Sequence, residues 1–182
     1  FELKDDETIV SSRISFYKNP KVSKTPKELF LNGESLELLS IKINTTAKVI
    51  RHGKNFSIEE ASVDDPIYTQ GFIVGARNLK HSSQINQEKT SRINANYEIK
   101  DDGLLLIEPP HSFILEITVR IHPESKTDLN GLYQSSGNYC TQCEAHGFRQ
   151  ITYYLDRPDV LSVFTTKIKA NRDHYPVLLS NG

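Results

Sequence analysis

The most regular part of the chain is the stretch His111-Ser-Phe-Ile-Leu-Glu-Ile-Thr-Val-Arg-Ile-His122. Apolar residues occupy every second position, namely Phe113, Leu115, Ile117, Val119 and Ile121. Polar residues fill the positions between them from Glu116 onward, namely Glu116, Thr118, Arg120 and His122. Because successive side chains of a strand point to opposite faces, this period of two predicts a long β-strand with one buried face.

Shorter segments on both sides repeat the alternation, with apolar residues on one face of each predicted strand. Those before the stretch are Val10, Ile14 and Phe16 in a strand at Thr8–Tyr17, and Leu39, Ile41 and Ile43 in a second strand. Those after it lie in strands predicted at residues 164–170 and Val177–Leu179. A hairpin is predicted where Asp101-Asp-Gly103 separates Tyr97–Lys100 from Leu104–Ile107, because glycine accepts the positive φ of a tight turn.

These strands, without any helical repeat, predict an all-β fold: an antiparallel β-sandwich or curved sheet. One short helical turn is predicted near 156–161, where Pro158 and Asp159 suit a first turn. Just before it, the stretch Tyr153-Tyr-Leu-Asp-Arg-Pro-Asp159 predicts a strand that ends in a salt-bridged turn.

The length of 182 residues suits a single β domain over 1–182. A polar stretch at about 51–92 weakens the strand pattern, and we predict an insertion there, partly mobile or forming its own hairpin. The chain ends on Asn181-Gly182, a strong hairpin signal directly after an apolar segment. We therefore expect a fragment whose next strand follows Gly182.

The composition is that of a soluble globular protein, with 37% hydrophobic and 25% charged residues. The formal net charge of -1 gives no reason to expect nucleic acid or a membrane surface as a partner. No apolar run approaches the roughly 20 residues needed to span a bilayer. Two cysteines are too few for a disulfide scaffold, so a cytoplasmic location is expected.

Two groups of residues could carry chemistry. Cys140, Cys143 and His146 lie within seven residues, but a structural zinc needs four ligands and a redox C-x-x-C needs a βαβ unit. The alternative is two small, half-buried cysteines. Gln142 and Glu144 lie two apart, so an extended backbone would point both side chains the same way, which suits a ligand ammonium group. The alternative is an ordinary solvated face.

No motif for a complete catalytic site is present in the sequence. It contains no H-E-x-x-H, no G-x-S-x-G, no phosphate-binding glycine loop and no dinucleotide fingerprint. Nothing in this chain assembles a nucleophile, a base and an orienting group on its own.

Several long stretches together resemble bacterial aminopeptidase N, a branch of the H-E-x-x-H zinc aminopeptidases. The similarity is densest toward the C-terminus, over Thr127-Asp-Leu-Asn-Gly-Leu-Tyr-Gln-Ser135, Cys140-Thr-Gln-Cys-Glu-Ala-His-Gly-Phe-Arg149, Ile151–Leu161, Phe164–Lys167 and Tyr175–Gly182. It is looser over Phe1–Lys48, with its best early part at Leu31–Leu39, and it resumes over Tyr97–Pro123.

The resemblance implies a β-rich first domain of an enzyme that hydrolyses the first peptide bond of a chain. The zinc ligands and the G-A-M-E-N segment of this family belong to a following domain, so no catalytic and no metal-binding residue is expected in this chain. The fragment alone should be inactive, with the catalytic domain of the same polypeptide as its partner and peptides with a free N-terminus as substrates. By position, Glu144 would hold the substrate's α-ammonium and Gln142 would lie beside it.

Two departures and two rival interpretations accompany the resemblance. His146 stands where relatives usually carry an acidic residue, and its protonation would oppose a cationic substrate. The 51–92 stretch is also longer than the usual connection. The rivals are a stand-alone β-sandwich binding module without activity and a small metal or redox module built on Cys140, Cys143 and His146.

Overall fold

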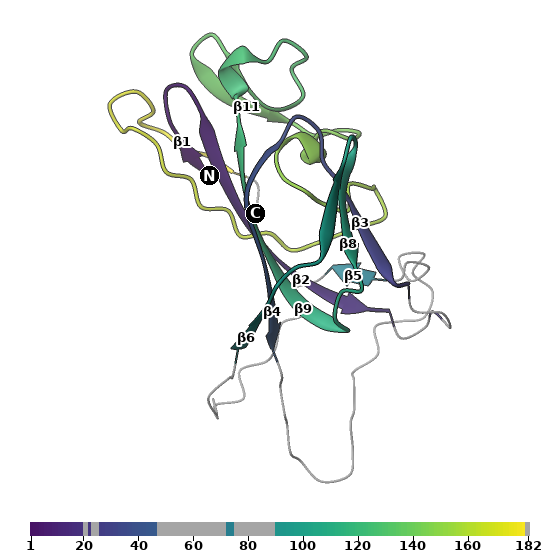
Figure 1. The fold of residues 1–182 in the computed structure, drawn as a ribbon. Coiled ribbons are helices and arrows are strands. Elements are labelled where there is room, and N and C mark those ends of the chain that lie inside the picture. Colours follow the sequence, from purple (N-terminus) through teal and green to yellow (C-terminus); the bar gives the residue numbers. More distant parts are fainter. Residues whose placement is uncertain (20–21, 23–25, 47–71, 75–89, 181–182) are drawn as a thin grey trace.

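The computed structural model describes residues 1–19, 22, 26–46, 72–74 and 90–180. These residues form three antiparallel sheets and two short 3-10 turns, and none of them is in an α-helix (Figure 1). The predicted all-β class is therefore confirmed. None of the helical segments in these ranges has the length and apolar character required to cross a bilayer.

The main sheet contains six strands in the order β1-β2-β9-β4-β6, with β5 pairing along β2. Its members are β1 (Glu2–Leu3), β2 (Thr8–Lys18), β4 (Glu37–Thr46), β5 (Phe72–Val74), β6 (Thr90–Ile93) and β9 (Ser112–Ile121). The central strand β9 is the stretch with the clearest alternation, and it pairs with β2 on one side and β4 on the other. Five of its apolar side chains are buried while the intervening ones are half-buried, as a period of two requires.

Two smaller sheets complete the fold. One has the order β3-β8-β7, and the other is a hairpin of β10 and β11. Their bounds are β3 (Glu28–Asn32), β7 (Tyr97–Lys100), β8 (Gly103–Ile107), β10 (Gly131–Ser135) and β11 (Asn138–Gln142). The predicted hairpin around Asp101-Asp102 is confirmed, since β7 and β8 pair antiparallel across it.

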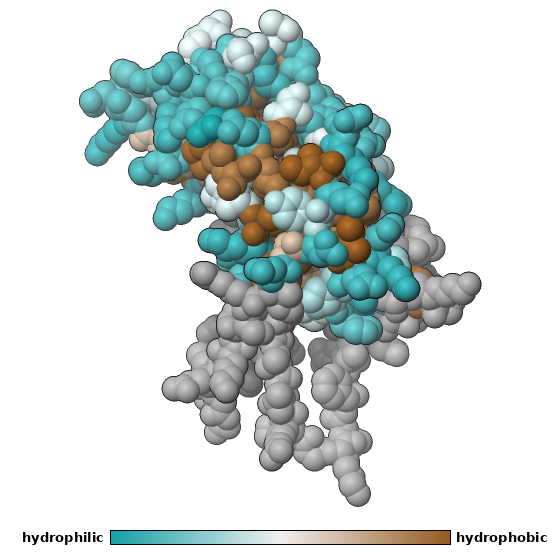
Figure 2. Space-filling view, viewed as in Figure 1, coloured by the Kyte–Doolittle hydropathy of each residue, from teal (hydrophilic) through white to brown (hydrophobic). Residues whose placement is uncertain are grey.

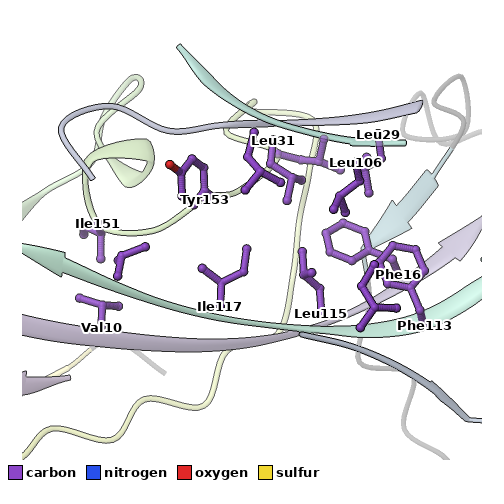
Figure 3. Close-up of a cluster of buried hydrophobic side chains, with 14 of the residues drawn as sticks. Val10, Phe16, Leu29, Leu31, Leu106, Phe113, Leu115, Ile117, Ile151 and Tyr153 are labelled. Atoms are coloured by element: carbon purple, nitrogen blue, oxygen red, sulfur yellow. The ribbon is translucent and has the colours of Figure 1, made fainter. Parts of the chain in front are cut away.

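The core lies between the main sheet and the three-stranded sheet, which face each other as the two layers of a sandwich (Figure 3). The main sheet contributes Phe16, Phe113, Leu115 and Ile117, and the second sheet contributes Leu31, Leu104 and Leu106; each is no more than 2% exposed. Full burial of such a side chain stabilises a protein by about 1.5–3 kcal/mol. Ile151 and Tyr153 belong to the segment that follows the β10–β11 hairpin, and their buried side chains extend this core.

One predicted strand face is wrong in detail because β4 contains a bulge. Its register against β9 shifts between Leu38 and Ser40, so that Leu38 stands opposite Val119 and Ile41 opposite Ile117. The extra residue places Leu39 on the outside, where it is 41% exposed, while Ile43 stays in the core. An alternation count cannot foresee one inserted residue, since a single-residue shift moves side chains to the other face.

Only two parts of the predicted 51–92 insertion lie within the described residues. These are β5, which pairs with β2, and β6, which pairs with β4. Both therefore extend the main sheet. The remainder of the predicted insertion lies outside the described residues.

The C-terminal part departs from the predicted strands. The predicted turn is present, with the Val160 N–H donating to the Arg157 carbonyl at 3.1 Å. The strands predicted at 164–170 and Val177–Leu179 are wrong: within the described residues, this part has one isolated bridge, between Glu2 and Lys169. A strand needs a neighbouring backbone, and these residues have none along most of their length. The predicted Asn181-Gly182 turn lies outside the described residues.

Candidate functional site

The β10–β11 hairpin carries the predicted site residues. Its two turn residues, Ser136 and Gly137, both have positive φ, 50° and 80°, as expected of a tight hairpin turn that suits the strand twist. The resulting register pairs Gly131 with Gln142. Gln142 is thus the last residue of β11, and the chain enters a loop directly after it.

A closed loop over residues 143–147 follows the hairpin. The Gly147 N–H donates to the Cys143 carbonyl at 2.9 Å, and the peptide bond between Glu144 and Ala145 is cis. A Cβ on Gly147 would lie 2.3 Å from the Asn130 Oδ1 and 2.4 Å from the Gln142 carbonyl, so only glycine fits at this close approach. The loop is therefore tightly packed at its base, whereas its tip at Glu144, Ala145 and His146 is exposed.

The structure brings Gln142 and Glu144 together through a backbone contact. The Gln142 side-chain amide donates to the Glu144 carbonyl oxygen at 3.2 Å. Both residues are exposed, and in the described part of the chain the Glu144 carboxylate forms no ion pair or hydrogen bond with another side chain. The arrangement leaves a carboxylate at a loop tip beside an amide, a pair able to accept N–H groups from a cation.

The segment after the loop enters the core at once. A 3-10 turn over Phe148–Gln150 is followed by six buried residues, 151–156. The Phe148 ring contacts the Tyr154 ring at a centroid distance of 4.9 Å and the Phe164 ring at 5.6 Å. Asn32 and Tyr154 form an isolated bridge with two backbone hydrogen bonds. The exposed loop is thus joined directly to a rigid part of the sandwich.

A buried ion pair lies behind the loop. The Arg149 Nε donates to the Asp156 Oδ2 at 2.8 Å, with side-chain exposures of 17% and 9%. The Arg149 Nη1 also lies 3.5 Å from the Glu34 Oε1 in the β3–β4 connection. Of the strand and salt-bridged turn predicted at Tyr153–Asp159, only the turn forms, where Arg157 pairs with Asp159 at 2.8 Å. The predicted strand is wrong, because this segment has only the isolated bridge at Tyr154. Asp156 instead forms its ion pair with Arg149, which the sequence pattern did not indicate.

Lys126 provides a second polar link to the base of the loop. Its Nζ donates to the Asn130 carbonyl at 2.5 Å and to the Gln150 side-chain oxygen. Burial lowers the pKa of the Lys126 ammonium, because it weakens hydration of the charged form. Sequence reasoning missed this residue as well, since its partners depend on how the loop folds back.

The cysteines and His146 do not form a metal centre. Both thiols are free and half-buried, and His146 is exposed. Burial raises the pKa of the Cys143 thiol, which disfavours the thiolate that zinc requires. Across the described ranges, no three His, Cys, Asp or Glu side chains are grouped to hold a metal ion. The half-buried alternative for the cysteines fits these observations.

Charged side chains line an open hollow of about 590 Å³ on another part of the surface, where the β1–β2 turn lies beside the start of β4 and the end of β9. Its lining residues are Lys4, Asp5, Asp6, Glu7, Glu37, Arg120 and His122. The Arg120 guanidinium pairs there with Glu7 at 2.5 Å and Glu37 at 2.7 Å. The lining holds four carboxylates against Lys4 and Arg120, and both basic groups form ion pairs with Glu7 or Glu37. These ion pairs join the turn before β2 to β4 and β9.

Similarity to known proteins agrees with this structure. Residues 17–182 match the model of the Peptidase M1 N-terminal domain. Aminopeptidase N of Escherichia coli is 42% identical over 141 residues, covering 77% of this chain and 14% of that protein. Aminopeptidase N of Haemophilus influenzae is 60% identical over 70 residues, covering 38% of this chain and 8% of that protein.

A solved structure is similar over nearly the whole chain. It is a crystal structure of Legionella pneumophila aminopeptidase A in complex with aspartic acid, with a TM-score of 0.63 and 26% identity. The match covers 96% of this chain and 15% of that one. The matches thus cover 8–15% of the length of these proteins. With a family match over most of its residues and the same all-β architecture, the chain belongs to the M1 peptidase family and represents its N-terminal domain.

Proposed function

We propose that this chain is the N-terminal domain of a zinc-dependent aminopeptidase that releases N-terminal amino acids from peptides. The M1 family is zinc-dependent, and the curated relatives of this chain are named aminopeptidase N. When bound, zinc would polarise the scissile carbonyl and activate a water molecule. Its ligands are expected in the following domain, so the 182-residue chain by itself should hydrolyse no peptide.

We assign the substrate amine to the exposed loop, with Glu144 as its anchor and Gln142 as its neighbour. The observation that carries this assignment is the hydrogen bond from the Gln142 amide to the Glu144 carbonyl, which holds the end of β11 beside the loop tip. An aminopeptidase has to recognise a chain end rather than any peptide bond. An ammonium taken out of water needs a charged partner, because an unpaired buried charge costs several kcal/mol.

The loop is suited to such a role because its base is closely packed and its tip is exposed to solvent. Gly147 packs against Asn130 and the Gln142 carbonyl, while Glu144 and His146 remain exposed. A fixed carboxylate orients the bound amine and so places the first peptide bond at a constant distance from it. His146 at the same tip would oppose a cationic substrate when protonated.

The partner of this domain is proposed to be the remaining part of the same polypeptide. Exposed apolar residues gather in the C-terminal stretch: Leu161, Val163, Phe164, Val177, Leu178 and Leu179. In Figure 2, apolar side chains form an area on the face that this stretch crosses in Figure 1. Contiguous exposed apolar surface marks an interaction site, and the E. coli relative is about seven times longer than the matched part. We also propose a cytoplasmic location, supported by two free thiols.

The test of the amine anchor is Glu144→Gln in the full-length enzyme. It removes the charge but keeps the shape of the side chain, so kcat/KM for a peptide with a free N-terminus should fall more than about tenfold, on the order of 2–4 kcal/mol. A matched control is Glu28→Gln, which neutralises an exposed carboxylate on β3 and should leave the kinetics unchanged. Kinetics of Glu144→Gln equal to those of the control would refute the assignment.

A further inference from the structure

Arg149 lies two residues beyond the closure of the loop and binds Asp156 with three donors. Its Nε donates to the Asp156 Oδ2 at 2.8 Å, and its backbone N–H donates to the same oxygen at 3.1 Å. Its Nη2 donates to the Asp156 carbonyl at 3.1 Å. These contacts fix both the backbone and the guanidinium plane of Arg149 against the buried segment 151–156.

The same residue also joins the loop to the β3–β4 connection. The Arg149 carbonyl accepts from the Glu34 N–H at 3.0 Å, and its Nη1 lies 3.5 Å from the Glu34 Oε1. Asp156 is linked to the adjacent end of β3, because its N–H donates to the Asn32 Oδ1 at 3.3 Å. Arg149 therefore stands where the downstream end of the loop, the buried segment and the second sheet meet.

The upstream end of the loop is fixed independently by the hairpin. Gln142 is held in β11 by its pairing with Gly131, and Gly147 closes the loop onto Cys143. Five residues, 143–147, thus lie between two fixed points. With both ends held, the exposed Glu144 has little freedom to move relative to the sandwich; with one end released, its carboxylate would sample a wider volume.

The geometry points to Arg149 as a positioning residue: held by Asp156 and Glu34, it fixes the loop that presents Glu144 to the substrate amine. This inference rests on the proposed function of Glu144. Arg149 would act on substrate binding only through the loop. The fork of the guanidinium matters, because a lysine keeps the charge but cannot bind the carboxylate, the carbonyl and Glu34 at once.

A double-mutant cycle in the full-length enzyme tests the inference, using Arg149→Lys, Glu144→Gln and the combination. Arg149→Lys should raise KM for a peptide with a free N-terminus about tenfold while kcat changes less than about twofold. In the Glu144→Gln background the same change should alter KM less than about twofold, because residues that act through one another are not additive.

The matched control is Arg157→Lys. Arg157 also pairs with an aspartate, here through both carboxylate oxygens of Asp159 at 2.8 and 3.0 Å, but it is half exposed and lies in the turn beyond the buried segment. It should leave KM unchanged. Asp156→Asn, which keeps the shape of the acceptor, provides a second entry to the cycle if Arg149→Lys does not fold.

The outcomes separate this inference from the proposed function. Non-additive KM effects confined to Arg149→Lys or Asp156→Asn would support both. If Glu144→Gln raises KM but the Arg149→Lys effect is equally large in its presence, Arg149 is only a structural residue and the inference falls. If Glu144→Gln changes neither constant, the proposed function falls and takes the inference with it.

Discussion

The sequence predicts strands both in β9 and within the C-terminal stretch 161–180, but only β9 is a strand in the structure. In β9, Leu115 is 0% and Ile117 1% exposed. In the C-terminal stretch, Val163 is 77% and Leu179 85% exposed. β9 is hydrogen-bonded to neighbours on both sides, whereas the C-terminal stretch forms one isolated bridge at Lys169 in the described part of the chain.

The difference shows that alternation gives a segment one apolar face but does not provide the neighbouring strand with which its backbone must pair. β9 finds β2 and β4 within this chain, so its backbone groups and its apolar face are satisfied together. The C-terminal stretch has the apolar face without the ladder. Its apolar residues lie outside this core, as expected of the surface that we propose for the rest of the polypeptide.

The largest effect is expected when one leucine is substituted in each of the two regions of the 182-residue chain. Leu115→Ala should lower the free energy of unfolding by about 2–5 kcal/mol, because it removes a fully buried side chain and leaves a cavity. Leu179→Ala removes the same atoms from an exposed site and should change it by less than about 0.5 kcal/mol. Urea unfolding of the two variants measures both values.

An equal cost at the two positions would contradict the comparison, since it would mean that Leu179 is buried in solution. In the full-length enzyme the expectation for Leu179→Ala reverses. There the proposed covering of the stretch should make the substitution destabilising, and comparing the two lengths separates burial within this domain from burial between domains.

The sequence predicted the layers of the fold well because the core strands follow simple alternation. β2, β7, β8 and β9 lie within a residue or so of their predicted positions. The prediction failed where one inserted residue changes which side chains face the core, and where a segment lacks a neighbouring strand. The bulge in β4 moved Leu39 outward, and the C-terminal stretch lacked a ladder to join.

The candidate site was predictable only in part, for a similar reason. Gln142 and Glu144 are close in sequence, so their spacing and the family resemblance suffice to single them out. The structure adds the hydrogen bond between them. Arg149 and Glu34 are far apart in sequence, and their contact exists only because the loop returns against the β3–β4 connection. Local patterns carry no signal for such a pair.

A smaller effect is expected where the two regions are joined. The Tyr154 hydroxyl, on the buried segment, donates to the Ser162 Oγ at 2.7 Å in the C-terminal stretch. Tyr154→Phe removes this bond and leaves the ring in place, so it should cost about 1 kcal/mol of unfolding free energy. Tyr17→Phe, at an exposed site in β2, is the control and should cost nearly nothing.

Hydrogen exchange adds a local readout to this second test. Loss of the Tyr154 bond should increase exchange of amides near Ser162 while β9 amides change only with global stability. An unchanged unfolding free energy together with unchanged exchange would show that this hydrogen bond does not hold the stretch, and that other contacts do, such as that of Phe164 with Tyr154.

The smallest effect concerns the isolated bridge to β1. The Lys169 Nζ donates to the Glu2 carboxylate at 2.8 Å, and this hydrogen bond lowers the pKa of the Glu2 carboxyl. Beside it, the Leu3 N–H donates to the Lys169 carbonyl at 2.8 Å. Both side chains are largely exposed, so Lys169→Ala should reduce protection of the Leu3 amide by no more than a few-fold.

The pH dependence gives this small effect a definite sign. A carboxyl whose pKa is lower in the folded chain adds stability above its unfolded-chain pKa, and that contribution is lost as pH falls through the folded-chain pKa. The Lys169→Ala effect should therefore be present at about pH 7 and vanish near pH 2. It should also weaken in about 1 M salt, where screening acts over roughly 3 Å. A loss of protection that persists under either condition would mean that the lysine stem, rather than its charge, holds the stretch against β1, and the two regions would then be joined by packing as well as by backbone.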